Sequence, residues 1–364
     1  MKIDAKFPRI KTLHQLVKNL ESKSPVVEPM KLREGPDSDL AGSLQVFANQ
    51  EHEKELVLDA LECLVNRGLL DEAKNKLLDV LNEASFYRGF PELATYGWLE
   101  RHSMWFDPQV KFDPPDVLNP NGCILDGVMR LYDTAFDIKA FGLSAYLANK
   151  LIRDLEEKFG VSRVKIDGKM DVDPKTVQIE AFGKQVEIAK QLRNGIEYRI
   201  PPLGWIIDVM PSEPVNTSVR SCAPYKQAED LQFYPFKRAA QFTTGKPFML
   251  IFAYLPRFNL FLREDSVGFT EKFFRSLARR AFIGLSNDTQ PLSNHDPRVK
   301  NRTLGDASRL LAGLMFVDLE SERYHVFFNP RTANPIARGI EHFARNSHPI
   351  TDLASYDDFA HDNY

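Results

Sequence analysis

Two aspartates and a lysine lie close together in a short apolar segment, and their chemistry suggests a metal-assisted reaction. The segment runs from Asn121 to Phe141 and contains Asp126, Asp137 and Lys139. Asp137 and Lys139 are two residues apart, so in a strand they point to the same face. Carboxylate oxygens suit Mg²⁺, and a nearby ammonium group orients or deprotonates water, or balances charge on a phosphate. These three side chains are the candidate site.

A β-hairpin is the element that must bring these groups together. Apolar, β-branched and aromatic residues flank a short polar break, which is typical of two paired strands. We expect strands over 124–131 and 135–141. Antiparallel pairing would then place Asp126 opposite Ile138 or Lys139, so a small register shift or bulge is needed to gather all three charges. The alternative is a surface hairpin with solvated charges, but charges within an apolar strand are costly without a partner or a function.

The composition is that of a globular chain with a packed core. The chain has 364 residues, of which 43% are hydrophobic and 27% charged, enough for one large or two ordinary domains. A net charge of -3 means that any basic footprint must be local. The three cysteines are far apart and form neither a disulfide framework nor a metal-ligand spacing. Without a long apolar run or a signal-peptide core, we expect a cytoplasmic protein with no membrane partner.

Three parts follow from the pattern along the chain. Residues 1–45 are predicted to form a basic amphipathic arm and a Pro-rich linker. Residues 46–260 contain the hairpin and begin with a helical lead-in over 46–90. Residues 261–364 are mostly helical, with a second hairpin around Ser321 that we expect to pack on the core.

The middle of the chain suggests a crossover between strands. Residues 161–195 are interpreted as an irregular insertion with a short helix at its end, and residues 197–211 as a strand. A helix over 228–245, broken at Pro235, precedes an apolar strand over 246–256. A strand, a helix and a strand in succession predict a right-handed crossover within one mixed sheet.

A glutamate near the start of a predicted helix has a simple structural explanation. Pro91 suits the first turn of a helix, and Glu92 follows it. A glutamate at a helix N-terminus is stabilised by the helix dipole by a few tenths to about 1 kcal/mol, and this alone accounts for its presence.

Two basic clusters lie in the last third of the chain. Arg275 and Arg279 fall on one helix face with Arg280 beside them, and the second cluster consists of Arg298, Lys300 and Arg302. Such clusters usually form a solvated face, and the alternative is contact with nucleic-acid phosphates.

The order of these elements resembles the restriction-endonuclease-like superfamily, the PD-(D/E)XK nucleases. A helix with Glu92 precedes a strand with Asp126 and a strand with Asp-Ile-Lys at 137–139, and a KRAAQF segment at 237–242 precedes an apolar strand. The resemblance covers residues 86–254, and its specificity lies in the order and context of short motifs. It implies an α/β fold with a mixed central sheet flanked by helices, and helical additions at both ends.

By this resemblance, three residues take the central roles. Asp126 matches the metal-binding aspartate, Asp137 the acidic residue of the triplet, and Lys139 the catalytic lysine. Asp126 follows a leucine where the family motif has a proline, whereas a literal Pro-Asp pair ends at Asp116. We favour Asp126, because it lies in a strand that pairs with the triplet strand, whereas Asp116 lies in a Pro-rich turn.

The same resemblance implies further ligands, a cofactor and a substrate. Glu92 matches an acid that some members add to the metal shell, the Ile138 carbonyl is a further ligand, and Gln241 matches a supporting glutamine. The implied activity is hydrolysis of DNA phosphodiesters with Mg²⁺ or Mn²⁺, with RNA left open. A role in restriction or defence, and a homodimer, are family themes only. The alternative is an inactive nucleic-acid-binding or protein-interaction scaffold, because fold alone does not fix function.

Overall fold

Two compact units make up the chain, and each is described by itself. The computed structural model describes residues 51–336, apart from residues 82, 142, 169–173, 211–223, 257–267 and 322. The expected arm and linker over 1–45 lie outside the described residues. The first unit extends to Trp105 and includes residues 319–322, and the second comprises residues 106–318 and those from 323 onward. No helix in the described ranges is both long and apolar enough to span a bilayer.

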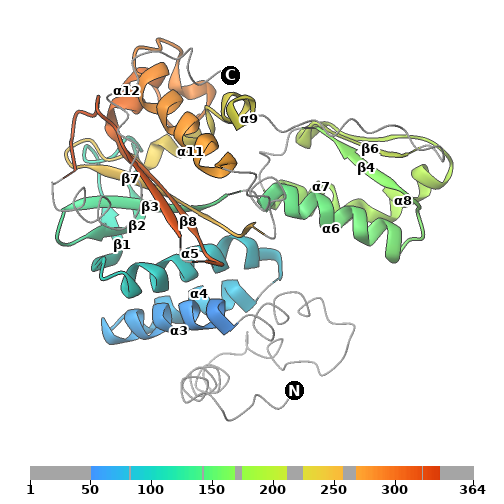
Figure 1. Ribbon diagram of the computed structural model, residues 1–364, viewed down its shortest axis with the longest axis horizontal. Helices are drawn as coiled ribbons and strands as arrows, with labels where there is room; N and C mark the ends of the chain where they lie inside the picture. Colours follow the sequence, from blue (N-terminus) through green and yellow to red (C-terminus); the bar gives the residue numbers. More distant parts are fainter. Residues whose placement is uncertain are drawn as a thin grey trace. The chain divides into compact units, whose positions relative to one another are not determined.

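Within its described residues, the first unit consists of three helices: α3 (Glu51–Asn66), α4 (Leu70–Leu81) and α5 (Glu83–Arg101) (Figure 1). All three pack on one another through buried apolar side chains. The backbones of α3 and α5 approach closely at Gly97, where a Cβ atom would lie only 1.8 Å from the Leu56 carbonyl oxygen. Glycine is therefore required for this helix crossing.

Pro91 lies inside α5 rather than in its first turn, so the expected start of this helix was wrong. The helix begins at Glu83 and continues through Pro91. Proline removes one backbone donor from the helix, but the flanking side chains of Phe90 and Leu93 are fully buried. Tertiary packing of this kind outweighs local preference. Glu92 is consequently an interior helix residue, and the helix dipole does not account for it.

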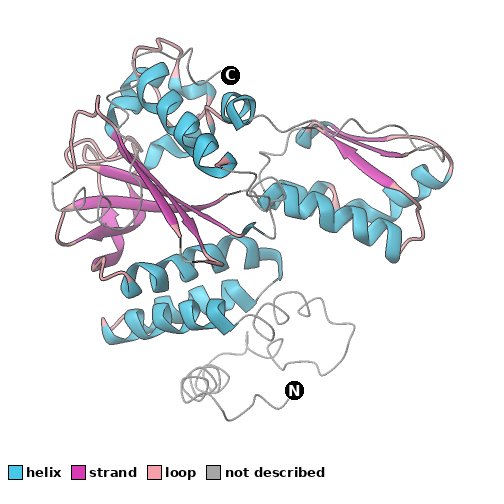
Figure 2. Cartoon of the chain, viewed as in Figure 1, coloured by secondary structure: helices cyan, strands magenta, loops and turns pink. Residues whose placement is uncertain are grey.

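A six-stranded mixed sheet forms the centre of the second unit (Figure 2). Its first three strands form an antiparallel meander, the next two run parallel to the third, and the last is antiparallel. In spatial order the strands are β1 (Phe106–Phe112), β2 (Cys123–Met129), β3 (Thr134–Ala140), β7 (Phe248–Tyr254), β8 (Leu311–Asp318) and β9 (Tyr324–Phe328). The expected α/β class with a mixed central sheet flanked by helices is confirmed.

The C-terminal hairpin belongs to this sheet instead of packing on it as an extension. Its strands β8 and β9 pair antiparallel as expected, and β8 also pairs in parallel with β7. Every residue of β7 and β8 is buried. Strands covered on both faces need continuous apolar runs, which explains the unbroken hydrophobic sequences of these two strands.

Helices cover one face of the six-stranded sheet and enclose an aromatic core. The covering elements are α9 (Pro224–Asp230), the 3-10 helix η4 (Tyr234–Gln241), α11 (Phe269–Arg279) and α12 (Leu304–Leu310). Phe274 of α11 stacks on Phe316 of β8 with 3.9 Å between ring centroids, and Phe316 stacks on Phe252 of β7. Aromatic burial of this extent anchors the helices to the sheet.

A separate α/β module lies between β3 and β7 in the sequence. A three-stranded sheet in the order β4 (Val164–Asp167), β6 (Trp205–Val209), β5 (Tyr198–Ile200) forms its core. Its helices are α6 (Leu143–Glu157), α7 (Pro174–Glu180) and α8 (Gln185–Arg193). The segment expected to be irregular over 161–195 is therefore mostly regular structure.

The expected crossover from β6 to β7 was also wrong. A 3-10 turn at Pro201–Leu203, followed by Gly204 with φ 64°, folds β6 back onto β5 as a local hairpin. The parallel neighbours of β7 are β3 and β8. The short turn between β5 and β6 therefore places β6 in the three-stranded sheet.

Candidate functional site

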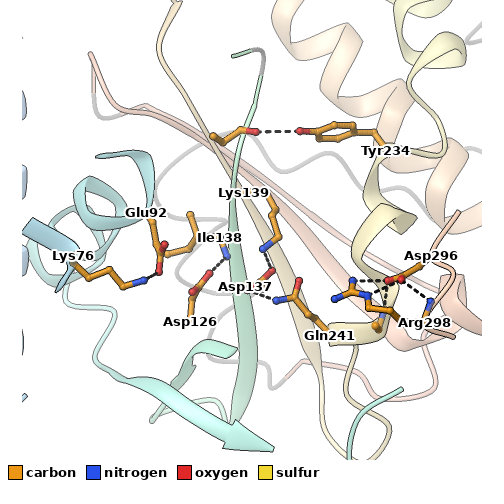
Figure 3. Close-up of polar contacts among 12 residues, drawn as sticks. Lys76, Glu92, Asp126, Asp137, Ile138, Lys139, Tyr234, Gln241, Asp296 and Arg298 are labelled. Carbon is orange, nitrogen blue, oxygen red and sulfur yellow. Dashed lines mark hydrogen bonds and ion pairs between the residues drawn. The ribbon is translucent and has the colours of Figure 1, made fainter. Parts of the chain in front are cut away.

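The candidate site begins where β2 and β3 separate. The two strands pair as far as Gly127 and Phe136. Beyond that pair, the Ile138 N–H donates to the Asp126 Oδ2 carboxylate oxygen at 2.6 Å, so a side chain takes over from the strand pairing (Figure 3). In this register Asp126 lies one position closer to Asp137 along β3 than in the expected pairing with Ile138. The separation of the two strands therefore brings the charges together, which was expected to need a register shift or a bulge.

Asp137 is the buried centre of the site. It is 1% exposed, and its carboxylate forms an ion pair with Lys139. The Gln241 Nε2 group donates to Asp137 Oδ1 at 3.2 Å, whereas the buried Gln241 Oε1 atom has no hydrogen-bond partner among the described residues. The structure therefore brings Asp126, Asp137, Lys139 and Gln241 together (Figure 3).

Burial and a neighbouring carboxylate perturb the ionisation of Asp137. Loss of solvent raises the pKa of Asp137 to about 8, Lys139 opposes this shift, and Asp126 adds to it by repulsion and hydrogen bonding. Two adjacent carboxylates favour keeping one proton between them. The pair is thus short of positive charge, which a cation would supply.

The donor set of this pair fits a hard divalent cation such as Mg²⁺. Asp126 and Asp137 provide carboxylate oxygens, and the unpartnered Gln241 Oε1 is a further buried acceptor. Within the described part of the chain, no group of three or more His, Cys, Asp or Glu side chains could hold a metal. Mg²⁺ is commonly bound by only one or two carboxylates and retains several waters, so the pair suffices.

Ile138 contributes its backbone to the site. Because the N–H and C=O of a strand residue point to the same edge, its carbonyl faces the β2 side, where Asp126 lies. Its role as a metal ligand stays a prediction.

Glu92 belongs to the helical unit. Its carboxylate pairs with Lys76 of α4, and its side chain is 13% exposed. This ion pair is a structural reason for a glutamate inside α5, and the place of Glu92 in a metal shell stays a prediction.

The helix η4 is fastened to β3 near both of its ends. The Tyr234 hydroxyl donates to the Ala140 carbonyl oxygen at 3.1 Å, and Gln241 donates to Asp137 (Figure 3). The helix expected over 228–245 is interrupted, but before Pro235: α9 ends at Asp230, and the 3-10 helix η4 begins at Tyr234 and ends at Gln241, with Pro235 in its first turn. Gln241 is therefore positioned by an anchored element.

Asp116 occupies a different setting from Asp126. It is exposed in the segment between β1 and β2, where its carbonyl oxygen accepts from the Thr244 N–H at 2.9 Å. Of these two aspartates, it is Asp126 that contributes to the raised pKa of Asp137. The geometry therefore favours Asp126 as the partner of Asp137.

The first basic cluster does not form a solvated face. Arg279 is fully buried and Arg280 is 7% exposed, because α11 continues into a buried π-helical turn, Arg280–Gly284. Arg275 is half-buried, whereas Lys300 of the second cluster is exposed. Buried guanidinium groups do not meet phosphates from solvent, so the expected contact at Arg279 and Arg280 is not supported.

Asp296 is a site-supporting residue that sequence reasoning missed. It is 1% exposed and accepts hydrogen bonds from Arg298 Nε and Nη2, each at 2.8 Å, and from the Ala240 N–H at 2.9 Å. Burial opposes its ionisation, but these donors hold the pKa of Asp296 below its ordinary value. The Ala240 contact joins residues 56 apart, so no local pattern could reveal it.

Cys123 lies in the electrostatic environment of the same site. Burial raises the pKa of its thiol to about 11, with Asp137 adding to the shift and Arg298 opposing it. The thiol is therefore protonated at neutral pH and is a poor nucleophile.

Comparisons with protein-family models, curated proteins and solved structures gave no match. The inference about function consequently starts from the geometry around Asp137.

Proposed function

We propose that this protein is a metal-dependent endonuclease of the PD-(D/E)XK type that hydrolyses DNA phosphodiester bonds. The observation that supports this most is the meeting of Asp126, Asp137 and Lys139 where β2 separates from β3. Gln241 adds a polar contact to the same carboxylate. Two carboxylates and an ammonium group at one buried point have little structural use together.

Each side chain has a definable task in this reaction. Asp126 and Asp137 would hold Mg²⁺ or Mn²⁺, which when bound supplies Lewis-acid stabilisation of charge on the phosphate. Lys139 is 26% exposed at its side chain, so its ammonium group can reach both Asp137 and a water at the site edge. It would orient the attacking water and balance charge on the phosphate. Gln241 fixes the orientation of the Asp137 carboxylate.

Burial strengthens these effects and also makes the site costly without a cation. Charges act more strongly where water is excluded, and Asp137 is almost fully buried. The raised pKa of Asp137 reflects this cost. A restriction-endonuclease-like core, a role in restriction or defence, and a homodimer that cuts both strands are part of the same proposal and rest on the sequence resemblance.

An inactive nucleic-acid-binding or protein-interaction module is the second candidate. One observation favours it: the protein itself already provides contacts for both carboxylates, from the Ile138 N–H to Asp126 and from Lys139 and Gln241 to Asp137. In such a module the polar cluster would only fix the geometry of the hairpin.

A cleavage assay separates the two candidates. The purified protein, a D137A/K139A double variant and an Asp116→Asn control would each be incubated with supercoiled and linear plasmid in Mg²⁺, Mn²⁺ or EDTA. We expect the wild type and the control to cut only with metal, and the double variant not to cut. Metal-independent binding by all three proteins, with no cleavage, would favour the inactive module.

A further inference from the structure

A buried aspartate holds an arginine beside the carboxylate site. Arg298 donates from Nε and Nη2 to the two carboxylate oxygens of Asp296. Asp296 also accepts from the Ala240 N–H, and the next residue is Gln241, which contacts Asp137. Through these hydrogen bonds, Asp296 connects Arg298 to η4, the short helix whose residue Gln241 contacts Asp137. Figure 3 shows the Arg298 guanidinium between Asp296 and Gln241.

The hydrogen bonds from Arg298 to Asp296 leave part of the guanidinium group available for a further acceptor. Arginine carries five N–H donors in a planar fork, and Asp296 engages Nε and Nη2. In the part of the chain that the structure describes, Nη1 has no hydrogen-bond partner. The Arg298 side chain is 42% exposed, whereas that of Asp296 is 1% exposed. One edge of the guanidinium is therefore fixed inside the protein and the other faces outward.

A smaller electrostatic effect agrees with this geometry. The charge of Asp137 contributes to raising the pKa of Arg298, after the larger effect of the Asp296 hydrogen bonds. Lys300 and Arg302, which follow in the same loop, are exposed. In a chain of net charge -3, this loop is a local basic surface next to the acidic pair. A polyanion could follow such a surface toward the site.

We propose that Arg298 binds the phosphate group on which the Asp126–Asp137 site acts, and that Asp296 is the residue that positions it. The inference rests on the proposed nuclease function and assigns its substrate contact. Arginine is suited to this task because its planar fork can bond one carboxylate and one phosphate at the same time. Asp296 fixes the side chain in advance, so little conformational entropy is lost when a phosphate binds.

The test compares Arg298→Ala, Arg298→Lys and a control, Lys158→Ala, with the wild type. Lys158 is an exposed cation that follows α6 in the module between β3 and β7, outside the basic loop. Two readouts are needed: kcat and KM for plasmid cleavage in Mg²⁺, and the Kd of a short DNA duplex in EDTA as a function of salt. Thermal melts identify any variant that fails to fold. Because Arg298→Lys keeps a cation beside Asp296, it provides the test if Arg298→Ala unfolds.

We expect Arg298→Ala to lower kcat/KM roughly 10- to 100-fold, as for loss of a charge-assisted hydrogen bond. Arg298→Lys should recover only part of this loss, and Lys158→Ala should stay within about twofold of the wild type. In EDTA, Arg298→Ala should reduce the magnitude of the salt slope by about 0.9, the value for one phosphate contact.

Failure of this inference differs from failure of the nuclease proposal. If the wild type cuts DNA and both Arg298 variants match it in kcat/KM and salt slope, Arg298 does not bind the phosphate. The proposal that the protein is a nuclease is retained in that case. If the wild type does not cut but Arg298→Ala selectively weakens duplex binding, the phosphate site stands and the nuclease proposal fails. Equal duplex binding by the wild type and the Arg298 variants, in a protein that does not cut, overturns both.

Discussion

Replacing Asp137 by asparagine tests the central electrostatic feature of the site. Asparagine has nearly the same shape as a protonated aspartate, but it is neutral at every pH. The Gln241 contact and the burial of the side chain can both be kept in this variant. The substitution therefore removes the ionisation of Asp137 while leaving the packing intact.

The expected effect follows from the raised pKa of Asp137. Burial and Asp126 raise this pKa from 3.8 to about 8, so the folded protein keeps a proton that the unfolded chain releases. The resulting stabilisation is complete below pH 4 and is lost as the pH rises to about 8. Each pKa unit corresponds to about 1.4 kcal/mol, so the decline is on the order of 6 kcal/mol at most. The Asp137→Asn variant should not show this decline.

Urea denaturation in EDTA at several pH values would measure the effect. At pH 4 we expect wild type and Asp137→Asn to have similar free energies of unfolding. At pH 9 the variant should be more stable than the wild type, because only the wild type must bury a second carboxylate charge. The difference between the two proteins cancels the titration of groups elsewhere in the chain.

One result would refute this reasoning. Parallel stability curves for the two proteins from pH 4 to 9 would mean that Asp137 ionises normally in the folded chain. The carboxylate pair would then be well solvated or fully compensated by Lys139, and the electrostatic argument for a cation at this site would be lost.

Three further predictions concern metal binding, catalysis and helix packing. Mg²⁺ at a hundredfold excess over its Kd at neutral pH should stabilise the wild type by about 2.7 kcal/mol. The same Mg²⁺ concentration should stabilise the wild type more at high pH, where Asp137 is ionised, and should not stabilise Asp137→Asn. An identical rise in Tm for both proteins would place the ion elsewhere. Lys139→Ala should lower kcat by roughly 10²- to 10⁴-fold with little change in Tm, and plasmid cleavage at the wild-type rate would remove Lys139 from the mechanism. Gly97→Ala should destabilise the helical unit by about 3 kcal/mol or more, because its Cβ would overlap the Leu56 carbonyl. Gly245→Ala, which meets open space, is the control in the same denaturation experiment.

Local signals predicted the hairpin around the site. Apolar, β-branched and aromatic residues around a short polar break indicate two strands and their turn, and β2 and β3 lie where expected. The pairing of Asp137 with Lys139 also follows from a spacing of two residues within one strand. The exact partner of Asp126 did not follow, because it depends on where the two strands separate.

Long-range pairing explains most of what the sequence did not reveal. The continuous apolar run of β8 is compatible with an appended hairpin or with a central strand, and only its pairing with β7 decides between them. The contact between Asp296 and Ala240 joins a loop to the 3-10 helix η4, and their sequences carry no common motif. The start of α5 was misplaced because local proline preference was given more weight than tertiary packing.

The module inserted between β3 and β7 has a consequence for the order of folding. The contact between Gln241 and Asp137 closes a loop of 104 residues, and loop closure costs more entropy as the flexible length grows. The three-stranded module has its own local pairings, including the short hairpin of β5 and β6. If these form first, they shorten the flexible length that must be closed before β3 and β7 can align. The carboxylate site would then be assembled late, and destabilising the module would slow its formation without altering any residue that touches substrate.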